Sequence, residues 1–233
     1  MLDESLVAST LNTALTGGAD FAEVFVEDKR NASAVLDDGK IEELTSGRDR
    51  GAGIRVVAGD TTGFAHTADL SQSGLAQAAK AAAAAAQGGG GGVRKVSLER
   101  QEASRSVEVE TFPETVPKAT KVELLQRADE EARSSGGAIT QVSARYGDSR
   151  RKILVANSDG LLAGDDQVRT FFAVSCVAQG DTGMQTGRES QGRTVGFEMF
   201  DQYDVSEMAR TAAQRAITKL SARPAPSLSL IHI

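Results

Sequence analysis

Apolar residues recur at helical spacing in several parts of the chain, and each recurrence predicts a helix. The clearest case follows Asp204 and Glu207, which are predicted to cap a helix near the carboxy-terminal end. Its apolar residues are separated by three or four positions: Val205, Met208, Ala209, Ala212, Ala213, Ala216, Ile217 and Leu220. Thr120 and Glu123 are spaced as a capping box and predict a second helix, which should end at the glycines 136–137.

Two more helices are predicted in the first half of the chain. The first has four apolar residues on one face, and Gly17 is placed to end it. These four residues are Val7, Leu11, Ala14 and Leu15. The second is an alanine-rich helix that runs to Ala86, with the acidic residue Asp69 expected as its cap.

Alternating apolar and polar positions predict strands between these helices. In the first half of the chain, about five strands are expected as a meander: 22–26, 32–36, 41–45, 54–58 and 64–65. In the second half, the expected strands are 140–146, 153–156 and 168–176. Turn-forming residues separate them at 37–39, 59–63, 157–160 and 180–183. Because these turns are short, neighbouring strands should pair antiparallel.

A run of five glycines, 88–92, is the clearest boundary in the chain. Such a run is flexible and cannot hold a packed element. A phosphate-binding loop is excluded, since it would need a Lys-Ser or Lys-Thr pair at a helix start and none follows. We therefore predict an α+β fold with two consecutive units, each an antiparallel sheet packed with helices. The units are 1–87 and 107–222, joined by a Gly-rich, polar linker at 88–106.

The composition is that of a soluble globular protein, with 40% hydrophobic and 25% charged residues and a net charge of −6. Lysines and arginines are scattered, so no basic face for nucleic acid is expected. No apolar segment approaches the length of a membrane span, and Asp3 and Glu4 do not suit a signal peptide. The single cysteine excludes an intrachain disulfide. A cytoplasmic protein that binds neither nucleic acid nor membrane is expected.

Two blocks of residues resemble the TldD/PmbA family of bacterial and archaeal zinc metallopeptidases, once named modulators of DNA gyrase. The block Gly51–Thr67, with the alanine-rich helix after it, resembles the family's amino-terminal domain. The second unit resembles the central domain in the segments Ile153–Gly160 and Gly196–Phe200. The sequence of these segments is more similar to the TldD branch than to its PmbA (TldE) paralogue. The resemblance covers only the amino-terminal half of the family's chain.

The resemblance implies that members of the family bind one zinc ion through a helical His-Glu-x-x-x-His motif and a further Cys. All of these residues lie in the carboxy-terminal half of the family's chain. This chain lacks that motif, and its soft ligands are limited to His66, His232 and Cys176. A catalytic zinc site needs three protein ligands and one open position. We therefore expect no catalytic and no metal-binding residue here, with zinc present only in the full-length protein. His66 should be a strand-end histidine, and Cys176 a buried residue beside Phe172 and Val174.

Other catalytic schemes find no support in the chain, which has no Gly-x-Ser-x-Gly elbow. Its paired acidic residues are adjacent, so they should be solvated surface groups rather than an acid–base pair. They are Asp37-Asp38, Glu42-Glu43, Glu130-Glu131 and Asp165-Asp166.

The resemblance implies a dimer with a PmbA/TldE-type paralogue or with a second copy, and unfolded or extended peptides as substrates. The sheets of this half would shape the peptide chamber and the dimer surface, and a peptide could add to a sheet edge. The sequence does not identify substrate-binding residues. The alternative is a non-catalytic scaffold or peptide-binding module.

The last residues depart from the family pattern. Residues 223–227 are expected to begin a linker to a missing carboxy-terminal catalytic domain. Leu228–Ile233 has the sequence that translation of a transposase-library adapter would give, so we expect it to be an artefact of sequencing. The chain alone is accordingly predicted to be inactive.

Overall fold

The computed structural model describes residues 1–86, 96–102 and 108–223. The predicted glycine linker at 88–92 and the expected adapter segment Leu228–Ile233, with His232, lie outside these residues.

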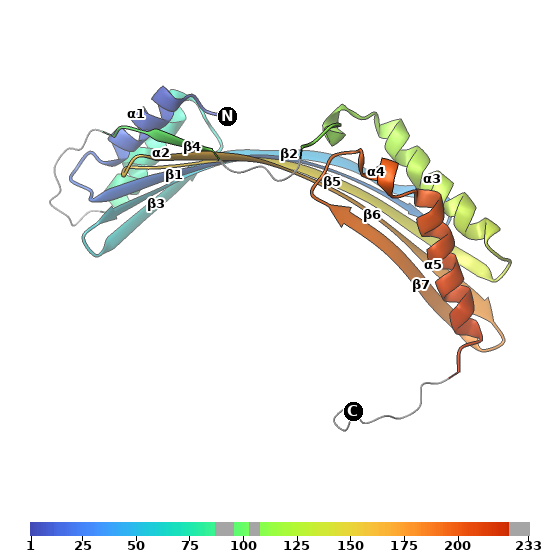
Figure 1. Ribbon diagram of the computed structural model, residues 1–233. Helices are drawn as coiled ribbons and strands as arrows, with labels where there is room; N and C mark the ends of the chain where they lie inside the picture. The colour runs from blue at the N-terminus through green and yellow to red at the C-terminus, as the bar shows by residue number, and fades with distance from the viewer. Residues whose placement is uncertain (87–95, 103–107, 224–233) are drawn as a thin grey trace, which may run out of the picture. The chain divides into compact units, whose positions relative to one another are not determined.

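Five α-helices, one short 3-10 helix and seven strands make up the described fold (Figure 1). The helices are α1 (Glu4–Ala14), α2 (Gln72–Ala85), α3 (Lys118–Ser134), α4 (Met199–Gln202) and α5 (Val205–Leu220), with the 3-10 turn η1 at Pro113–Thr115. The strands are β1 (Phe21–Asp37), β2 (Lys40–Ala58), β3 (Thr61–Thr67), β4 (Glu99–Glu102), β5 (Ile139–Asn157), β6 (Leu161–Gly180) and β7 (Gly183–Arg193). No helix among the described residues is long and apolar enough to cross a membrane.

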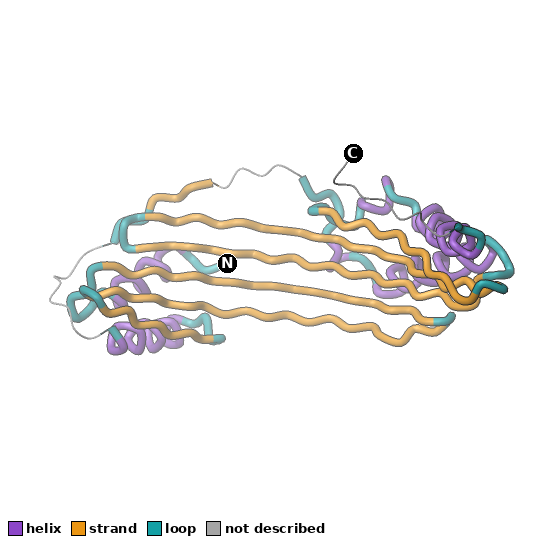
Figure 2. The backbone as a smooth tube through the Cα atoms, turned by 90° about the horizontal axis from the view of Figure 1, so that it is seen from below, coloured by secondary structure: helices purple, strands orange, loops and turns teal. Residues whose placement is uncertain are grey.

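The strands form one sheet in the order β3-β2-β1-β5-β6-β4, and β7 also pairs with β6 (Figure 2). The hairpins β2–β3 and β6–β7 are antiparallel, with Ala58 opposite Thr61 and Gly180 opposite Gly183 at their turns. Only β4 runs parallel to its neighbour, with Glu99 opposite Leu161. The predicted α+β class, with helices packed on an antiparallel sheet, is therefore confirmed.

The residues of the fold group into two compact units, and each unit is built from three separate segments of the chain. The first compact unit, unit 1, comprises residues 1–31, 46–108 and 149–168. The second, unit 2, comprises 32–45, 109–148 and 169–233. Each of the strands β1, β2, β5 and β6 contributes residues to both units. The units are therefore interleaved in sequence.

The prediction of a five-strand meander in the first half of the chain is wrong, because the same residues form only three strands, two of which are long. β1 includes both 22–26 and 32–36, and β2 includes both 41–45 and 54–58. The apolar alternation stops in the middle of these strands, so the pattern suggested loops there. Cross-strand polar contacts continue the pairing instead, as where Arg48 Nη2 lies 2.5 Å from Asp28 Oδ2.

In unit 1, α1 and α2 cover one face of the sheet (Figure 1). Alternate residues of β1 and β2 point into this core and are buried, whereas their neighbours Glu23 and Phe25 face the other side. The core members from β1, β2 and the helices include Ala22, Val24, Val26, Ile54, Val56, Val7, Leu11 and Leu75. The face predicted for the first helix is thus confirmed.

In unit 2, α3 and α5 cover the sheet (Figure 1). Aromatic residues fill part of the core. Tyr146 and Phe172 are fully buried, and Phe200 lies against both, with ring centroids 6.1 and 5.8 Å away. The strand face predicted for β6 is confirmed, since its members are all buried: Val168, Thr170, Phe172, Val174 and Cys176.

Three helix caps were predicted, and one of them is correct. The Asp204 side chain accepts a hydrogen bond from the Ser206 N–H at the start of α5. The capping box is wrong, because α3 begins at Lys118 with Pro117 as its cap, ahead of Thr120. The cap of α2 is Ser71, and Asp69 instead accepts a hydrogen bond from the Ser71 N–H.

Candidate functional site

Cys176 and His66, the described residues considered as metal ligands, lie in different units and different surroundings. Cys176 is completely buried, and burial raises the pKa of its thiol to about 11. A cysteine binds a metal ion as the thiolate, so this environment opposes coordination by Cys176. His66 is exposed one residue before the end of β3, where its ring stacks on Phe64 with centroids 6.3 Å apart.

The described residues do not fit a metal centre. Among them, no group of three or more His, Cys, Asp or Glu residues is placed to hold a metal ion. The acidic pairs serve structural contacts instead. Asp38 accepts a hydrogen bond of 2.6 Å from Arg133, and Asp37 accepts one of 3.1 Å from the Gln141 amide. We therefore derive no chemical step through a metal in this chain.

The residue block 51–67 forms the β2–β3 hairpin beneath α2. Gly63 of β3 is buried, and a Cβ placed there would lie 2.0 Å from the Ala82 carbonyl oxygen and 2.6 Å from the Ala86 nitrogen. Only glycine lets the helix backbone approach so closely. Gly63 is therefore required for the packing of α2 against β3.

The turn after β5, residues 157–160, fixes the neighbouring strand. Ser158 exchanges two hydrogen bonds with Ala22 of β1: its N–H donates to the Ala22 carbonyl (2.8 Å), and its hydroxyl accepts from the Ala22 N–H (3.1 Å). The Asn157 side chain accepts from the N–H groups of Asp159 and Leu161. These contacts order the turn.

Glu198 in the block 196–200 holds two chain segments together. Its carboxylate accepts hydrogen bonds from the N–H of Gly196 (2.7 Å) and of Thr111 (3.0 Å). Partial burial opposes the charged form, but these main-chain donors outweigh it and lower the pKa of Glu198. Phe197 donates a further hydrogen bond from its N–H to the Thr111 carbonyl (2.8 Å). Together these hydrogen bonds form a clamp between Thr111 and residues 196–198.

In unit 1, α1 and α2 leave one face of the sheet uncovered (Figure 2), and exposed aromatic side chains lie on that face. Phe25 and Phe64 are exposed on it, by 38% and 61%. Beside them, Arg55 donates a 2.7 Å hydrogen bond to Glu23 and lies over the Phe21 ring. Sequence reasoning missed this surface. Its available signal was that Phe21, Phe25 and Phe64 occupy strand positions that alternate with the small and apolar residues of the buried face.

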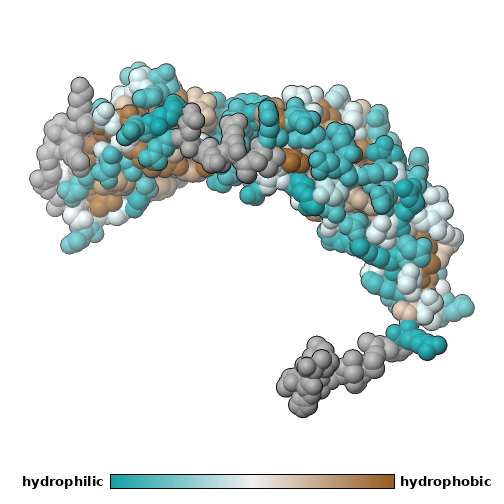
Figure 3. Space-filling view, in the orientation of Figure 1, coloured by the Kyte–Doolittle hydropathy of each residue, from teal (hydrophilic) through white to brown (hydrophobic). Residues whose placement is uncertain are grey.

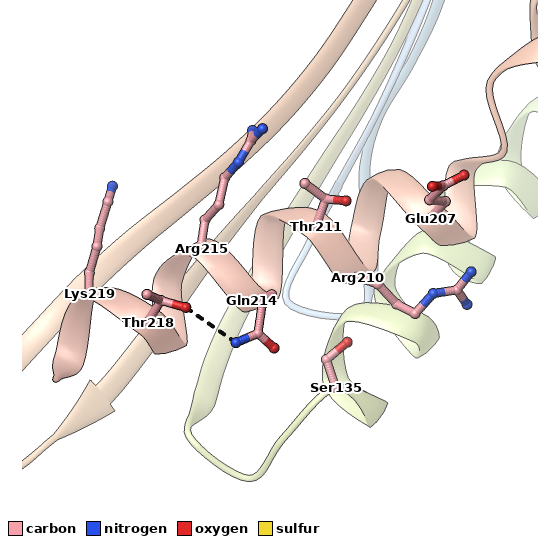
Figure 4. A pocket seen from close by; sticks show the side chains of 8 residues that line it. All are labelled: Ser135, Glu207, Arg210, Thr211, Gln214, Arg215, Thr218 and Lys219. Atoms are coloured by element: carbon pink, nitrogen blue, oxygen red, sulfur yellow. Dashed lines mark hydrogen bonds between the residues drawn. The ribbon is translucent and has the colours of Figure 1, made fainter. Parts of the chain in front are cut away.

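Helix α5 of unit 2 carries a shallow hollow of about 790 Å³, lined by Ser135 of the α3 end and by polar residues of α5 (Figure 4). Its cations already have partners. Arg210 donates to Glu131 (2.9 Å), and Arg215 and Lys219 donate to main-chain carbonyls of β7. The surrounding helical surface is mostly hydrophilic (Figure 3). The hollow therefore offers no evident ligand site.

Comparison with known families accounts for both parts of the fold. The model of PmbA/TldA metallopeptidase domain 1 matches residues 22–86, and that of the PmbA/TldA metallopeptidase central domain matches residues 112–220. The fold and the two matched domains thus define a protein of a metallopeptidase family. The chain belongs to the TldD/PmbA family.

Two curated relatives are named as metalloproteases. A metalloprotease of Methanothermobacter thermautotrophicus is 32% identical over 208 residues, which are 89% of this chain and 45% of that protein. A metalloprotease TldD homologue of Haemophilus influenzae is 29% identical over 215 residues, or 89% and 44% of the two chains. The chain thus spans about half the length of the curated relatives it matches.

Solved structures show the same fold. A Thermotoga maritima protein named as a modulator of DNA gyrase superposes with a TM-score of 0.76 at 19% identity, over 96% of this chain and 50% of that chain. TldE from Thermococcus kodakarensis gives a TM-score of 0.68 at 18% identity, over 92% and 47% of the two chains.

Proposed function

We propose that this chain is the non-catalytic amino-terminal part of a TldD-like zinc metallopeptidase that hydrolyses unfolded or extended peptides. The observation that carries the proposal is the match of two successive metallopeptidase-family domains, supported by relatives named metalloproteases. The described residues do not fit a metal centre. Zinc and the hydrolytic residues would therefore belong to further residues of a complete protein.

In this proposal, the sheet faces that the helices leave uncovered shape the peptide chamber and the dimer surface. The exposed rings of Phe25 and Phe64 support such a role, since exposed aromatic residues commonly mark contact surfaces. The partner would be a PmbA/TldE-type paralogue or a second copy, and the assembly would work in the cytoplasm.

A second candidate function is a scaffold or peptide-binding module without hydrolysis. The lack of a metal-ligand cluster among the described residues agrees with this function as it does with the first. The two functions differ in what the complete gene product does, because only the first requires zinc.

The experiment compares the 233-residue chain with the complete reading frame cloned from source DNA, each with and without the paralogue. Bound zinc is measured by mass spectrometry, and hydrolysis with an unfolded casein-derived peptide, with and without a chelator. We expect zinc and chelator-sensitive hydrolysis only for the complete product. Hydrolysis by the 233-residue chain would contradict our placement of the catalytic residues. A complete product that binds peptide without cleaving it would establish the binding module.

A further inference from the structure

Three arginines lie side by side on neighbouring strands of unit 1. Arg48 is in β2, Arg30 in β1 and Arg150 in β5, and these strands are adjacent in the sheet (Figure 2). Gly47 of β2 lies against Asn31 of β1, since a Cβ at Gly47 would be 3.3 Å from Asn31 Oδ1. The short turn between β1 and β2 makes these strands antiparallel, so the next pair along them is Arg48 and Arg30.

The register of β1 and β5 places Arg150 on the other side of Arg30. Two main-chain hydrogen bonds set this register, from the Ser158 N–H to the Ala22 carbonyl (2.8 Å) and from the Asp38 N–H to the Val142 carbonyl (2.9 Å). Each strand has the same number of residues between the two bonds, and Arg30 and Arg150 are the midpoints. Arg30 is therefore flanked by an arginine on both sides, at the strand spacing of about 4.8 Å.

The three arginine side chains point to the face of the sheet that carries α1 and α2. Each arginine lies four positions from a buried core residue of its own strand: Val26, Ala52 and Leu154. Because side chains of a strand alternate between the two faces, positions separated by an even number share a face. Arg30 is exposed, and the side chains of Arg48 and Arg150 are 45% and 17% exposed. The row is therefore accessible to solvent.

The outer two arginines have carboxylate partners of their own, whereas the middle one has none. Arg48 donates a 2.8 Å hydrogen bond from Nε to Asp28. Arg150 donates hydrogen bonds of 2.9 and 2.7 Å to the two oxygens of Asp166. Among the residues that the structure describes, no carboxylate forms an ion pair with Arg30. Like charges at directly opposite positions of a sheet lower stability, so Arg30 is a destabilising residue until an anion binds beside it.

Cations outnumber carboxylates around the row. The hydrogen bond from Arg48 lowers the pKa of Asp28. The charges of Arg30 and Arg50 lower it further, so one carboxylate serves three arginines. The charged side chains in and beside the row are five cations and three carboxylates: Arg30, Arg48, Arg50, Arg150, Lys152, Asp28, Asp69 and Asp166. The cations are therefore in excess by two charges.

We propose that Arg30 and the arginines on either side of it bind a phosphate group, supplied as a monoester or as free phosphate. A phosphate monoester carries about −1.5 to −2 charge at pH 7 and has three acceptor oxygens. These values match the excess of two cations and the three guanidinium groups. Guanidinium groups bind phosphate through paired hydrogen bonds. This site goes beyond the proposed function and does not depend on it.

Two other kinds of anion fit the row less well. A single carboxylate supplies only one negative charge and would leave half of the excess unneutralised. A nucleic-acid strand would bring consecutive phosphates past the row, where Asp28 and Asp166 would repel them. The net charge of −6 also opposes a polyanion at longer range. A compact anion with two charges avoids both conflicts.

The test measures binding to the 233-residue chain by isothermal titration calorimetry at constant ionic strength. The probes are inorganic phosphate, a capped Gly-Ser peptide that carries one phosphoserine, and the same peptide without phosphate. We expect saturable binding of the two phosphate-bearing probes only, and Arg30→Gln should weaken it at least about tenfold. Tighter binding of the phosphopeptide would identify a peptide as the source of the phosphate. Equal binding would identify free phosphate, and either result supports the site.

The matched control is Arg55→Gln, which changes an exposed arginine of β2 on the opposite face of the sheet. It should bind phosphate within about twofold of the wild type. Equal binding by Arg30→Gln and Arg55→Gln, or equal binding of acetate and phosphate, would overturn the proposal. Tighter binding of a single-stranded oligonucleotide than of the phosphopeptide would assign the row to nucleic acid and also overturn it.

Thermal melting gives a second readout that a purely structural role of Arg30 would not produce. In phosphate-free buffer of low salt, Arg30→Gln should melt about 1–2 °C above the wild type, because the repulsion from Arg48 and Arg150 is removed. Added phosphate should narrow this difference, since only the wild type binds it tightly. A variant that melts below the wild type in phosphate-free buffer would show that Arg30 stabilises the fold, and would overturn the proposal.

Discussion

Lys121 and Asp148 form an ion pair in the interior of unit 2. The ammonium of Lys121 donates a 2.7 Å hydrogen bond to Oδ2 of Asp148, and the two side chains are only 5% and 7% exposed. The Tyr146 hydroxyl donates to the same oxygen at 2.7 Å. One carboxylate of β5 thus anchors α3 and satisfies a buried phenol.

Replacing Lys121 by Met should lower the free energy of unfolding by about 3–5 kcal/mol, because Asp148 would remain buried without its cation. Urea denaturation at pH 7 measures the loss. The control is Lys118→Met on the same helix, where Lys118 is exposed and the change should stay within about 0.5 kcal/mol. Equal stability of the two variants would show that the buried pair contributes nothing.

The carboxylate of Glu198 should make stability depend on pH. Its pKa is lowered in the folded protein from an ordinary value near 4.5, so its contribution is complete above that pH and is lost as the pH falls through the lowered value. Glu198→Gln should cost about 2 kcal/mol at pH 7, since the charged acceptor of two main-chain N–H groups is removed.

Urea denaturation between pH 3 and pH 7 provides the measurement for Glu198. The difference between wild type and Glu198→Gln should be constant near neutrality and shrink below about pH 4.5. Glu123→Gln, at an exposed position of α3, serves as the control and should show no such trend. A difference independent of pH would mean that the charge of Glu198 is not what stabilises the clamp.

Gly187 of β7 is a further position where a side chain should not be tolerated. A Cβ there would lie 2.0 Å from the Ala212 carbonyl oxygen of α5. Gly187→Ala should therefore cost more than about 3 kcal/mol of unfolding free energy. Gly147→Ala in β5 is the matched control, because no atom lies within 4 Å of its added Cβ. Thermal or urea denaturation compares them, and similar losses would refute the packing argument.

Cys176 should be unreactive in the folded protein. Its thiol is buried, and with a pKa of about 11 it stays protonated at pH 8, whereas thiol reagents attack the thiolate. A disulfide reagent such as dithionitrobenzoate should label it stoichiometrically in urea and only at the rate of unfolding in buffer. Rapid labelling under native conditions would place Cys176 at an accessible surface.

The sequence predicted elements best where burial is one-sided. Leu11 of α1 and Ala212 of α5 were both placed correctly on buried faces, because helical spacing reports one covered side. β4 was missed, since its charged residues give no alternation. The length of β1 and β2 was missed for the same reason, because their middle segments use cross-strand polar contacts such as Asp28–Arg48.

The candidate site was less accessible to sequence reasoning than the fold. The position of Cys176 on a buried strand face followed from alternation and is confirmed. The hydrogen bond from Lys219 of α5 to the Thr186 carbonyl of β7 joins residues that are 33 positions apart and meet only after folding. No local pattern in the sequence predicts such a contact.

The sharing of four strands between units limits how the protein can be dissected. A fragment that ends in the 88–106 region would retain most of unit 1 but lack its segment 149–168, while carrying the unit 2 segment 32–45 without its neighbours. The complementary fragment would have the reverse defect. No single cut in the chain therefore releases either unit intact. Because the three segments of each unit alternate along the chain with those of the other, expression of a separate unit would require several cuts and new connections between its segments.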